Sequence, residues 1–181
     1  MNTIQDIDKQ FCEYVAKIED AAKELTFTPV VEFKLSDEIP KHIWNSIVYP
    51  GVYLIEMKND ARFSSFNDWV ADFTTKWEQE EFKRKFVPNL KKKRISHHAE
   101  LNEWIPIYLG KSKCVGKRIE EHLYLDLNRN TFALKLWRRP DFLNDYFRIS
   151  TIRVDVKSYD QILPIIENSL RNKINPIIGR Q

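Results

Sequence analysis

The sequence predicts an α+β protein in which a small central sheet is flanked by helices. Residues 51–55 and 105–109 are rich in the β-branched, aliphatic and aromatic residues that are typical of buried strands. Residues 4–25, 115–123 and 158–170 instead carry apolar side chains three or four positions apart, which is the spacing of an amphipathic helix. The length of 181 residues and the hydrophobic content of 43% fit one domain with appendages.

Charge, cysteine content and hydropathy narrow the class of protein. The formal net charge is only +3 although 30% of the residues are charged, so the distribution of charge matters more than its sum. Cys12 and Cys114 lie far apart and form no Cys-x-x-Cys pair, which favours a reducing compartment. No apolar run reaches the roughly 18 residues that a membrane span needs. We therefore expect a cytoplasmic protein without a membrane partner.

Residues 1–49 are expected to pack on the core as an N-terminal helix followed by an extended segment. The helical spacing of residues 4–25 favours a helix that covers one side of the sheet, and a dimerisation helix is the alternative. Residues 27–33 are rich in strand formers, and Pro29 places this strand at the edge of the sheet.

The two buried strands are separated by about fifty residues, which form a helical and basic insertion at about 57–104 within a core that spans residues 50–181. Its first part, residues 64–86, has aromatic residues at helical spacing. Its second part holds two basic clusters without an acidic residue, namely Lys83, Arg84 and Lys85, and then Lys91, Lys92, Lys93 and Arg94. Such clusters favour contact with nucleic-acid phosphates, and a solvated surface segment is the alternative.

A strand, a glycine turn and a basic helix follow one another in residues 105–123. Gly110 allows the backbone to approach a ligand closely. Arg118 and His122 are four residues apart, so they project from the same face of the helix. Together with Lys111 they are the side chains expected at a phosphate-binding site, whereas the alternative is a β-turn-α unit with a solvated basic helix. Nearby, the candidates for nucleic-acid contact are Lys113 and Lys117.

The last third of the chain is expected to add strands and a final helix. Residues 131–137 alternate between apolar and polar residues, which predicts a half-buried strand, and residues 146–156 are extended as well. Ser158 stands three residues before Gln161, which is the spacing of a capping box at the start of a helix.

Two features of this final helix stay open in the sequence. Pro164 either kinks the helix or lies in its first turn. Glu167 lies beside the apolar face, where it is either a surface residue or aimed into a site. Asn175-Pro176 marks the end of the helix, and a short extended tail follows.

Two tripeptides on the buried strands, Gly51-Val52-Tyr53 and Tyr108-Leu109-Gly110, resemble those that name the GIY-YIG nucleases. Arg118 follows Tyr108 by ten residues, as the catalytic arginine of that family does, and His122 matches a position where many members carry histidine. Glu167, in the last helix, looks like the family's metal-binding glutamate.

The resemblance covers residues 50–55 and 105–181, and it leaves residues 1–49 and the insertion unexplained. A short hairpin usually joins the two tripeptides, although some restriction enzymes of the family carry insertions there. An asparagine that often follows the glutamate helix aligns here with Gly179.

The resemblance implies a mainly antiparallel sheet and a divalent-metal-dependent endonuclease that hydrolyses phosphodiester bonds in DNA. The catalytic residues that it implies are Tyr53, Tyr108, Lys111, Arg118, His122 and Glu167. Glu167 would hold Mg²⁺ or Mn²⁺, and Arg118 would stabilise the charge that develops on the phosphate. Tyr53 would accept the proton of the attacking water in a cationic neighbourhood, and His122 would relay a proton or contact phosphate.

The favoured context of such a nuclease is restriction or phage defence. DNA is the expected partner, with RNA as the other nucleic acid to test, and a double-strand break would need a homodimer because one centre cuts one strand. Two alternatives remain open in the sequence. One is a non-catalytic nucleic-acid-binding module, and the other is a protein-interaction subunit whose aromatic insertion docks a partner.

Overall fold

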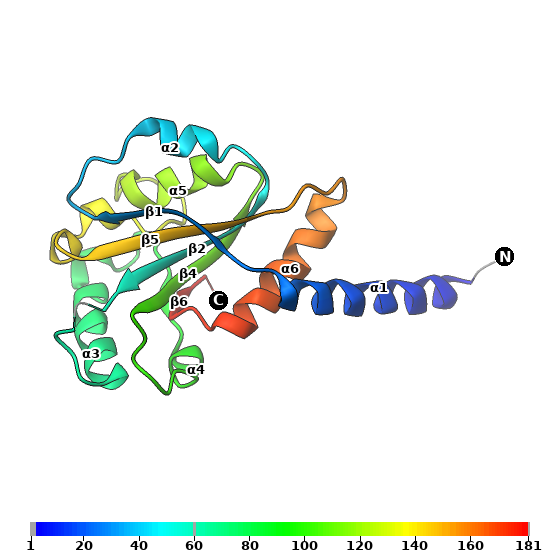
Figure 1. Cartoon of the computed structure of the whole chain (residues 1–181), viewed down its shortest axis with the longest axis horizontal. Helices are drawn as coiled ribbons and strands as arrows, with labels where there is room; N and C mark the ends of the chain where they lie inside the picture. The colour runs from blue at the N-terminus through cyan, green and yellow to red at the C-terminus, as the bar shows by residue number, and fades with distance from the viewer. Residues whose placement is uncertain (1–2, 60, 181) are drawn as a thin grey trace.

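A four-stranded antiparallel sheet forms the centre of the fold, as Figure 1 shows. The structure is a computed structural model that describes residues 3–59 and 61–180. In spatial order the strands are β1 (Thr28–Lys34), β5 (Tyr146–Arg153), β2 (Gly51–Lys58) and β4 (Trp104–Ser112). The helices are α1 (Ile4–Glu24), α2 (Lys41–Ser46), α3 (Phe66–Trp77), α4 (Lys92–Ile95), α5 (Val115–Tyr124) and α6 (Tyr159–Ile174). The predicted α+β class is thus confirmed.

Strand β2 carries apolar side chains to two cores, one on each face of the sheet. Tyr53 and Ile55 belong to the larger core, together with residues of α3 and α5. Val52 and Leu54 belong to the smaller core, which α6 and the end of α1 complete. Because both faces are covered, β2 is buried from Gly51 to Met57, and this explains the apolar run that ends at Ile55. The buried Glu56 that follows pairs with Arg148 at 2.8 Å.

The expected position of β1 at the edge of the sheet is confirmed. Its pairing with β5 is irregular between Pro29 and Val31, which is where a residue without an amide hydrogen is tolerated.

Helix α1 packs on α6 only through its second half. Ser169 donates a hydrogen bond of 3.2 Å to the carbonyl of Glu19, and Lys173 donates to the carbonyl of Lys23. The first half projects from the body of the molecule (Figure 1), and its large apolar side chains, Ile4, Ile7, Phe11 and Tyr14, are between 52% and 77% exposed. The helix that was expected to cover the sheet therefore contacts the core along only part of its length.

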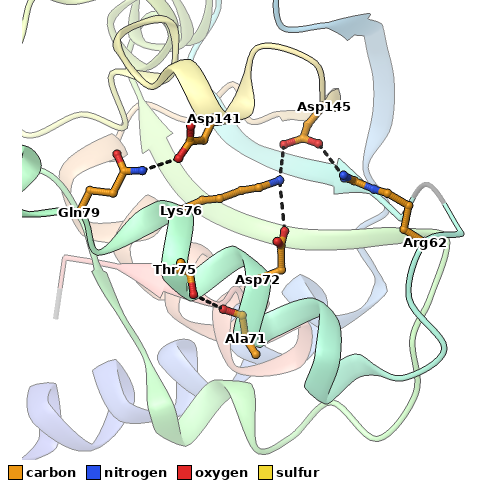
Figure 2. A network of polar contacts seen from close by, with 8 residues as sticks. All are labelled: Arg62, Ala71, Asp72, Thr75, Lys76, Gln79, Asp141 and Asp145. Atoms are coloured by element: carbon orange, nitrogen blue, oxygen red, sulfur yellow. Dashed lines mark hydrogen bonds and ion pairs between the residues drawn. The ribbon is translucent and has the colours of Figure 1, made fainter.

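The insertion between β2 and β4 begins with α3, which ends at Trp77, earlier than the helical spacing predicts. Figure 2 shows how polar contacts fasten it to the segment that precedes β5. Lys76 of α3 forms ion pairs with Asp72 at 3.1 Å and with the buried Asp145 at 3.4 Å. Arg62 contacts the same Asp145 at 3.2 Å, so the start of the insertion is docked on the core.

The end of the insertion pairs with the tail of the chain in a second, two-stranded sheet. Strand β3 (Asn89–Leu90) runs antiparallel to β6 (Ile178–Gly179). The amide of Lys91 donates to the carbonyl of Ile177 at 2.8 Å, and the His98 ring bonds to the carbonyl of Asn175 at 2.8 Å. This pairing places α4 and its basic residues beside the end of α6.

The predicted strand at residues 131–137 is wrong, because this segment is an irregular buried loop that leads into a 3₁₀ turn over Leu136–Arg138. Lys135 adopts a left-handed conformation with a φ of 55°, which no strand contains. Its buried ammonium donates to the carbonyls of Lys85, Leu127 and Arg129 at 2.8–3.0 Å. The alternation in the sequence reflects this buried cation between two leucines.

The final helix also differs in detail from its prediction. Ser158 precedes α6, but its side chain makes no capping hydrogen bond. Pro164 lies inside the helix and not in its first turn. Asn175 ends the helix in a left-handed conformation with a φ of 54°, as the Asn175-Pro176 pair indicates. Within residues 3–59 and 61–180, no helix is long and apolar enough to cross a membrane.

Candidate active site

An open cleft of about 700 Å³ lies beside β4 and receives residues from β2, β4, α5, α6 and β6. Five of the six residues expected to be catalytic line it, namely Tyr53, Tyr108, Lys111, Arg118 and Glu167. The sixth, His122, is fully buried and contacts Tyr53. The fold therefore brings together side chains from three distant parts of the sequence.

Gly110 gives the two tyrosines the space that they occupy. It lies opposite Tyr53 in the pairing of β2 with β4. A Cβ atom at this position would lie 2.4 Å from the Tyr53 hydroxyl and 3.0 Å from the Tyr108 ring. The ring centroids of the two tyrosines are 6.2 Å apart. A residue with a side chain at position 110 would displace at least one of these rings.

A buried histidine fixes the hydroxyl of Tyr53. The Nε2 atom of His122 lies 2.8 Å from that hydroxyl, and the Nδ1 atom lies 3.1 Å from the backbone nitrogen of Leu134. Because a backbone amide can only donate, Nδ1 accepts and carries no hydrogen. The hydrogen of the neutral ring is therefore on Nε2, and His122 donates to Tyr53.

The environment of His122 keeps its ring neutral. Burial, together with the charge of Arg118, lowers the pKa of His122 well below 6.5. A neutral ring with its acceptor nitrogen already bonded has no position for another proton, and a buried ring does not reach a phosphate in the cleft. The geometry places His122 where it can position Tyr53, and the proton relay or phosphate contact expected from the sequence stays a prediction.

Both tyrosines of the cleft are protonated near neutral pH. Burial raises the pKa of Tyr53 well above 10, and the neighbouring Tyr108 raises it further while Arg118 opposes the shift. Burial also raises the pKa of Tyr108, against the influence of Arg118. Tyr53 accepts a hydrogen bond from His122, so its own hydroxyl hydrogen remains available as a donor.

Arg118 is a half-buried cation that is held from two sides. One guanidinium nitrogen donates to Glu121 at 2.5 Å, and another donates to the carbonyl of Phe132. These contacts fix the planar group at the wall of the cleft. A fixed guanidinium is suited to binding two phosphate oxygens at once.

The carboxylate of Glu167 is paired on both oxygens. One oxygen lies 3.1 Å from the ammonium of Lys111, and the other accepts from Arg171 one helical turn further along α6. The side chain of Glu167 is only 13% exposed. Arg171 was missed in the sequence, although a glutamate four residues before an arginine on a helix is a recognisable pair.

The residues of the cleft fit a magnesium or manganese ion only in part. Within the described residues, no group of three or more His, Cys, Asp or Glu side chains could hold a metal ion. Mg²⁺ in phosphate chemistry often takes one or two carboxylates and completes its shell with water and substrate oxygens. Glu167 fits this pattern as a single protein ligand, and the ion would compete with Lys111 and Arg171 for it.

The predicted nucleic-acid contacts divide into residues near the cleft and residues away from it. Arg94 approaches the cleft, because its guanidinium lies 3.2 Å from the point where a Cβ atom of Gly179 would stand, and Lys91 lies beside it. Lys92 and Lys93 are exposed on α4.

The other predicted contacts have different surroundings. Lys83 pairs with Glu80, and Lys113 pairs with Asp160 at 3.0 Å. Lys85 bonds to Asn128 at 3.2 Å, and Arg84 and Lys117 are exposed at positions that do not line the cleft.

Comparisons of the chain with protein-family models, with curated proteins and with solved structures returned no match. The function must therefore be inferred from the residues of the chain and their geometry.

Proposed function

We propose that the protein is a divalent-metal-dependent endonuclease of the GIY-YIG type that hydrolyses phosphodiester bonds in DNA. The observation that carries the proposal is the convergence of Tyr53, Tyr108, Lys111, Arg118 and Glu167 on one cleft. These residues lie on two strands and two helices, and they combine cations, a carboxylate and phenols, which are the groups that phosphodiester hydrolysis uses.

The reaction requires a water oxygen to attack phosphorus while the bond to the leaving oxygen breaks. Arg118 is placed to bind the phosphate oxygens on which charge develops. A Mg²⁺ or Mn²⁺ ion held by Glu167 would supply a Lewis acid at the phosphate. Tyr53 would first pass its own proton to solvent and then take the proton of the attacking water, and the leaving oxygen would be protonated from solvent. His122 would donate a hydrogen bond that stabilises the phenolate.

The pairing of the Glu167 carboxylate with two cations favours a second candidate function. Because Lys111 and Arg171 already neutralise Glu167, the same cleft suits a module that binds nucleic-acid phosphates without a metal and without cleavage. The two functions differ in whether a divalent ion can displace these cations when a substrate phosphate is present.

The test is to incubate the protein with supercoiled plasmid in Mg²⁺, in Mn²⁺ or in EDTA, and to follow nicking on gels. We expect nicks in both metals and none in EDTA, and a loss of at least about 10²-fold in Arg118→Ala and Glu167→Ala. Matched controls outside the cleft are Arg153→Ala and Glu103→Ala, which remove exposed partners of surface ion pairs and should retain activity.

The outcomes separate the candidates. A wild-type protein that binds DNA or RNA but never cuts it in any metal would identify the binding module. Cleavage that survives both substitutions in the cleft would show that the reaction occurs elsewhere. A restriction or phage-defence context is part of the proposal, and it predicts protection against phage only while Glu167 is intact.

A further inference from the structure

The second basic cluster, Lys91, Lys92, Lys93 and Arg94, is attached to the wall of the cleft. Strand β3 ends just before it and pairs with β6, whose Gly179 lines the cleft. The Arg94 guanidinium lies 3.2 Å from the Cβ position of Gly179, and the Lys91 side chain lies 3.5 Å from the same point. The insertion therefore delivers two cations to the boundary of the candidate active site.

These four cations lack the compensation that other cations of the protein have. No described carboxylate forms an ion pair with any of them, whereas Lys83 pairs with Glu80 and Lys111 with Glu167. Burial and the nearby Arg94 lower the pKa of Lys91. Glu167 attracts Arg94 while Arg171 repels it, and the three lysines have no carboxylate partner of their own among the described residues. Binding a polyanion relieves the repulsion among these like charges.

A second hollow lies over this cluster, on residues adjacent to those of the cleft. It measures about 650 Å³ and is lined by the four cations together with His97, Asn172 and Asn175. Helix α6 contributes to both hollows, since Arg171 faces the cleft and the adjacent Asn172 faces the second hollow. Arg94 lies at the junction, beside Gly179 of the cleft.

We propose that the second hollow binds the DNA backbone on one side of the phosphate that is cut, with Arg94 at the junction and Lys92 and Lys93 on the outer phosphates. The inference rests on the proposed function for the identity of the neighbouring cleft. It divides the predicted nucleic-acid contacts in two: residues 91–94 hold the substrate, and residues 83–85 do not.

The experiment measures binding of fluorescently labelled duplex DNA by anisotropy in EDTA, over a series of salt concentrations. The variant Lys92→Gln/Lys93→Gln removes two exposed charges from the hollow, and Lys83→Gln/Arg84→Gln removes two exposed charges from the first cluster. If both lysines contact phosphates, the first variant should lower the slope of log K against log salt by about 1.8, since each contact contributes about 0.9. The second variant should keep the wild-type slope.

A footprint on the wild-type protein provides an independent readout that needs no variant. Acetylation of lysines in the presence and absence of the same duplex should show protection at Lys91, Lys92 and Lys93, and no protection at Lys83. Equal losses of slope in the two variants, or protection of both clusters alike, would overturn the inference.

Failure of the inference and failure of the proposed function give different results. A protein that nicks plasmid but binds DNA with an unchanged slope in Lys92→Gln/Lys93→Gln is a nuclease whose substrate takes another path. A protein that shows the expected loss of slope and never nicks plasmid uses the hollow without being a nuclease.

Discussion

Replacing Gly110 with alanine tests whether the position of the Tyr53 hydroxyl controls the site. The added methyl group would lie 2.4 Å from that hydroxyl and 2.7 Å from the ring carbon that bears it. A methyl carbon and a hydroxyl oxygen in ordinary contact lie about 3.5 Å apart, so the two groups must separate by about 1 Å. Both strands are paired in the sheet, and the Tyr53 hydroxyl is also held at 2.8 Å from Nε2 of the buried His122.

The paired strands and the contact with His122 determine how much unfolding free energy the variant loses. Overpacking a well-filled core costs about 1–3 kcal/mol. If the hydroxyl moves away from His122, the buried Nε2 donor is left without a partner, which costs about 1–3 kcal/mol more. We therefore expect Gly110→Ala to lose about 2–6 kcal/mol of unfolding free energy. A displacement of about 1 Å in a catalytic group also lowers the rate by about 10²-fold.

Urea unfolding and plasmid nicking, measured on the same preparations, check both numbers. The matched control is Gly179→Ala, because this glycine lines the same cleft and its added methyl group would contact the flexible side chains of Arg94 at 3.2 Å and Lys91 at 3.5 Å. The unfolding free energy of Gly179→Ala should stay within about 0.5 kcal/mol of the wild-type value, and the variant should still nick plasmid. A Gly110→Ala protein as stable and as active as this control would refute the reasoning.

Two further predictions concern pH. Burial raises the pKa of Tyr53 well above 10, so a nicking rate that depends on its phenolate should rise about tenfold per pH unit between about pH 7 and 9. A plateau in the initial rate below pH 9 would show that another group is the base. The pKa of His122 in the folded protein is well below 6.5, so below about pH 6.5 the unfolded chain binds a proton that the folded protein excludes. The unfolding free energy should therefore fall by up to about 1.4 kcal/mol for each unit by which the pH is lowered. Urea unfolding from pH 8 to 5 should show this dependence in the wild type and a shallower one in His122→Gln, and equal slopes would contradict it.

The central strands were predictable because their burial leaves a direct pattern in the sequence. Strand β2 is covered on both faces, and its five residues up to Ile55 form the apolar run that is typical of such an environment. Arg118 and His122 share a helix face by spacing alone, and the structure places them around Tyr53 as neighbours. No local pattern relates Tyr53 to Glu167, because they lie so far apart in the sequence. Their proximity was expected only from the family resemblance.

The errors arise where partners outside the local sequence decide the conformation. Residues 131–137 alternate like a strand, yet the alternation comes from a cation, Lys135, that is buried on three carbonyls. The hydrogen bond from the amide of Leu134 to His122 could not be predicted either, because no spacing rule relates a side chain to the amide of a distant loop. The pairing of β3 with β6 involves two residues on each strand, which is too short to carry a periodic signal.

The short ladder between β3 and β6 ties the boundary of the cleft to the core of the fold. Ile177 and Ile178 are fully buried in the larger core, and the amide of Ile177 donates to the carbonyl of Pro106 of β4 at 3.0 Å. Gly179 lies on β6, and Lys91 and Arg94 follow β3. The position of these cations beside the cleft therefore depends on the same buried isoleucines that complete the core.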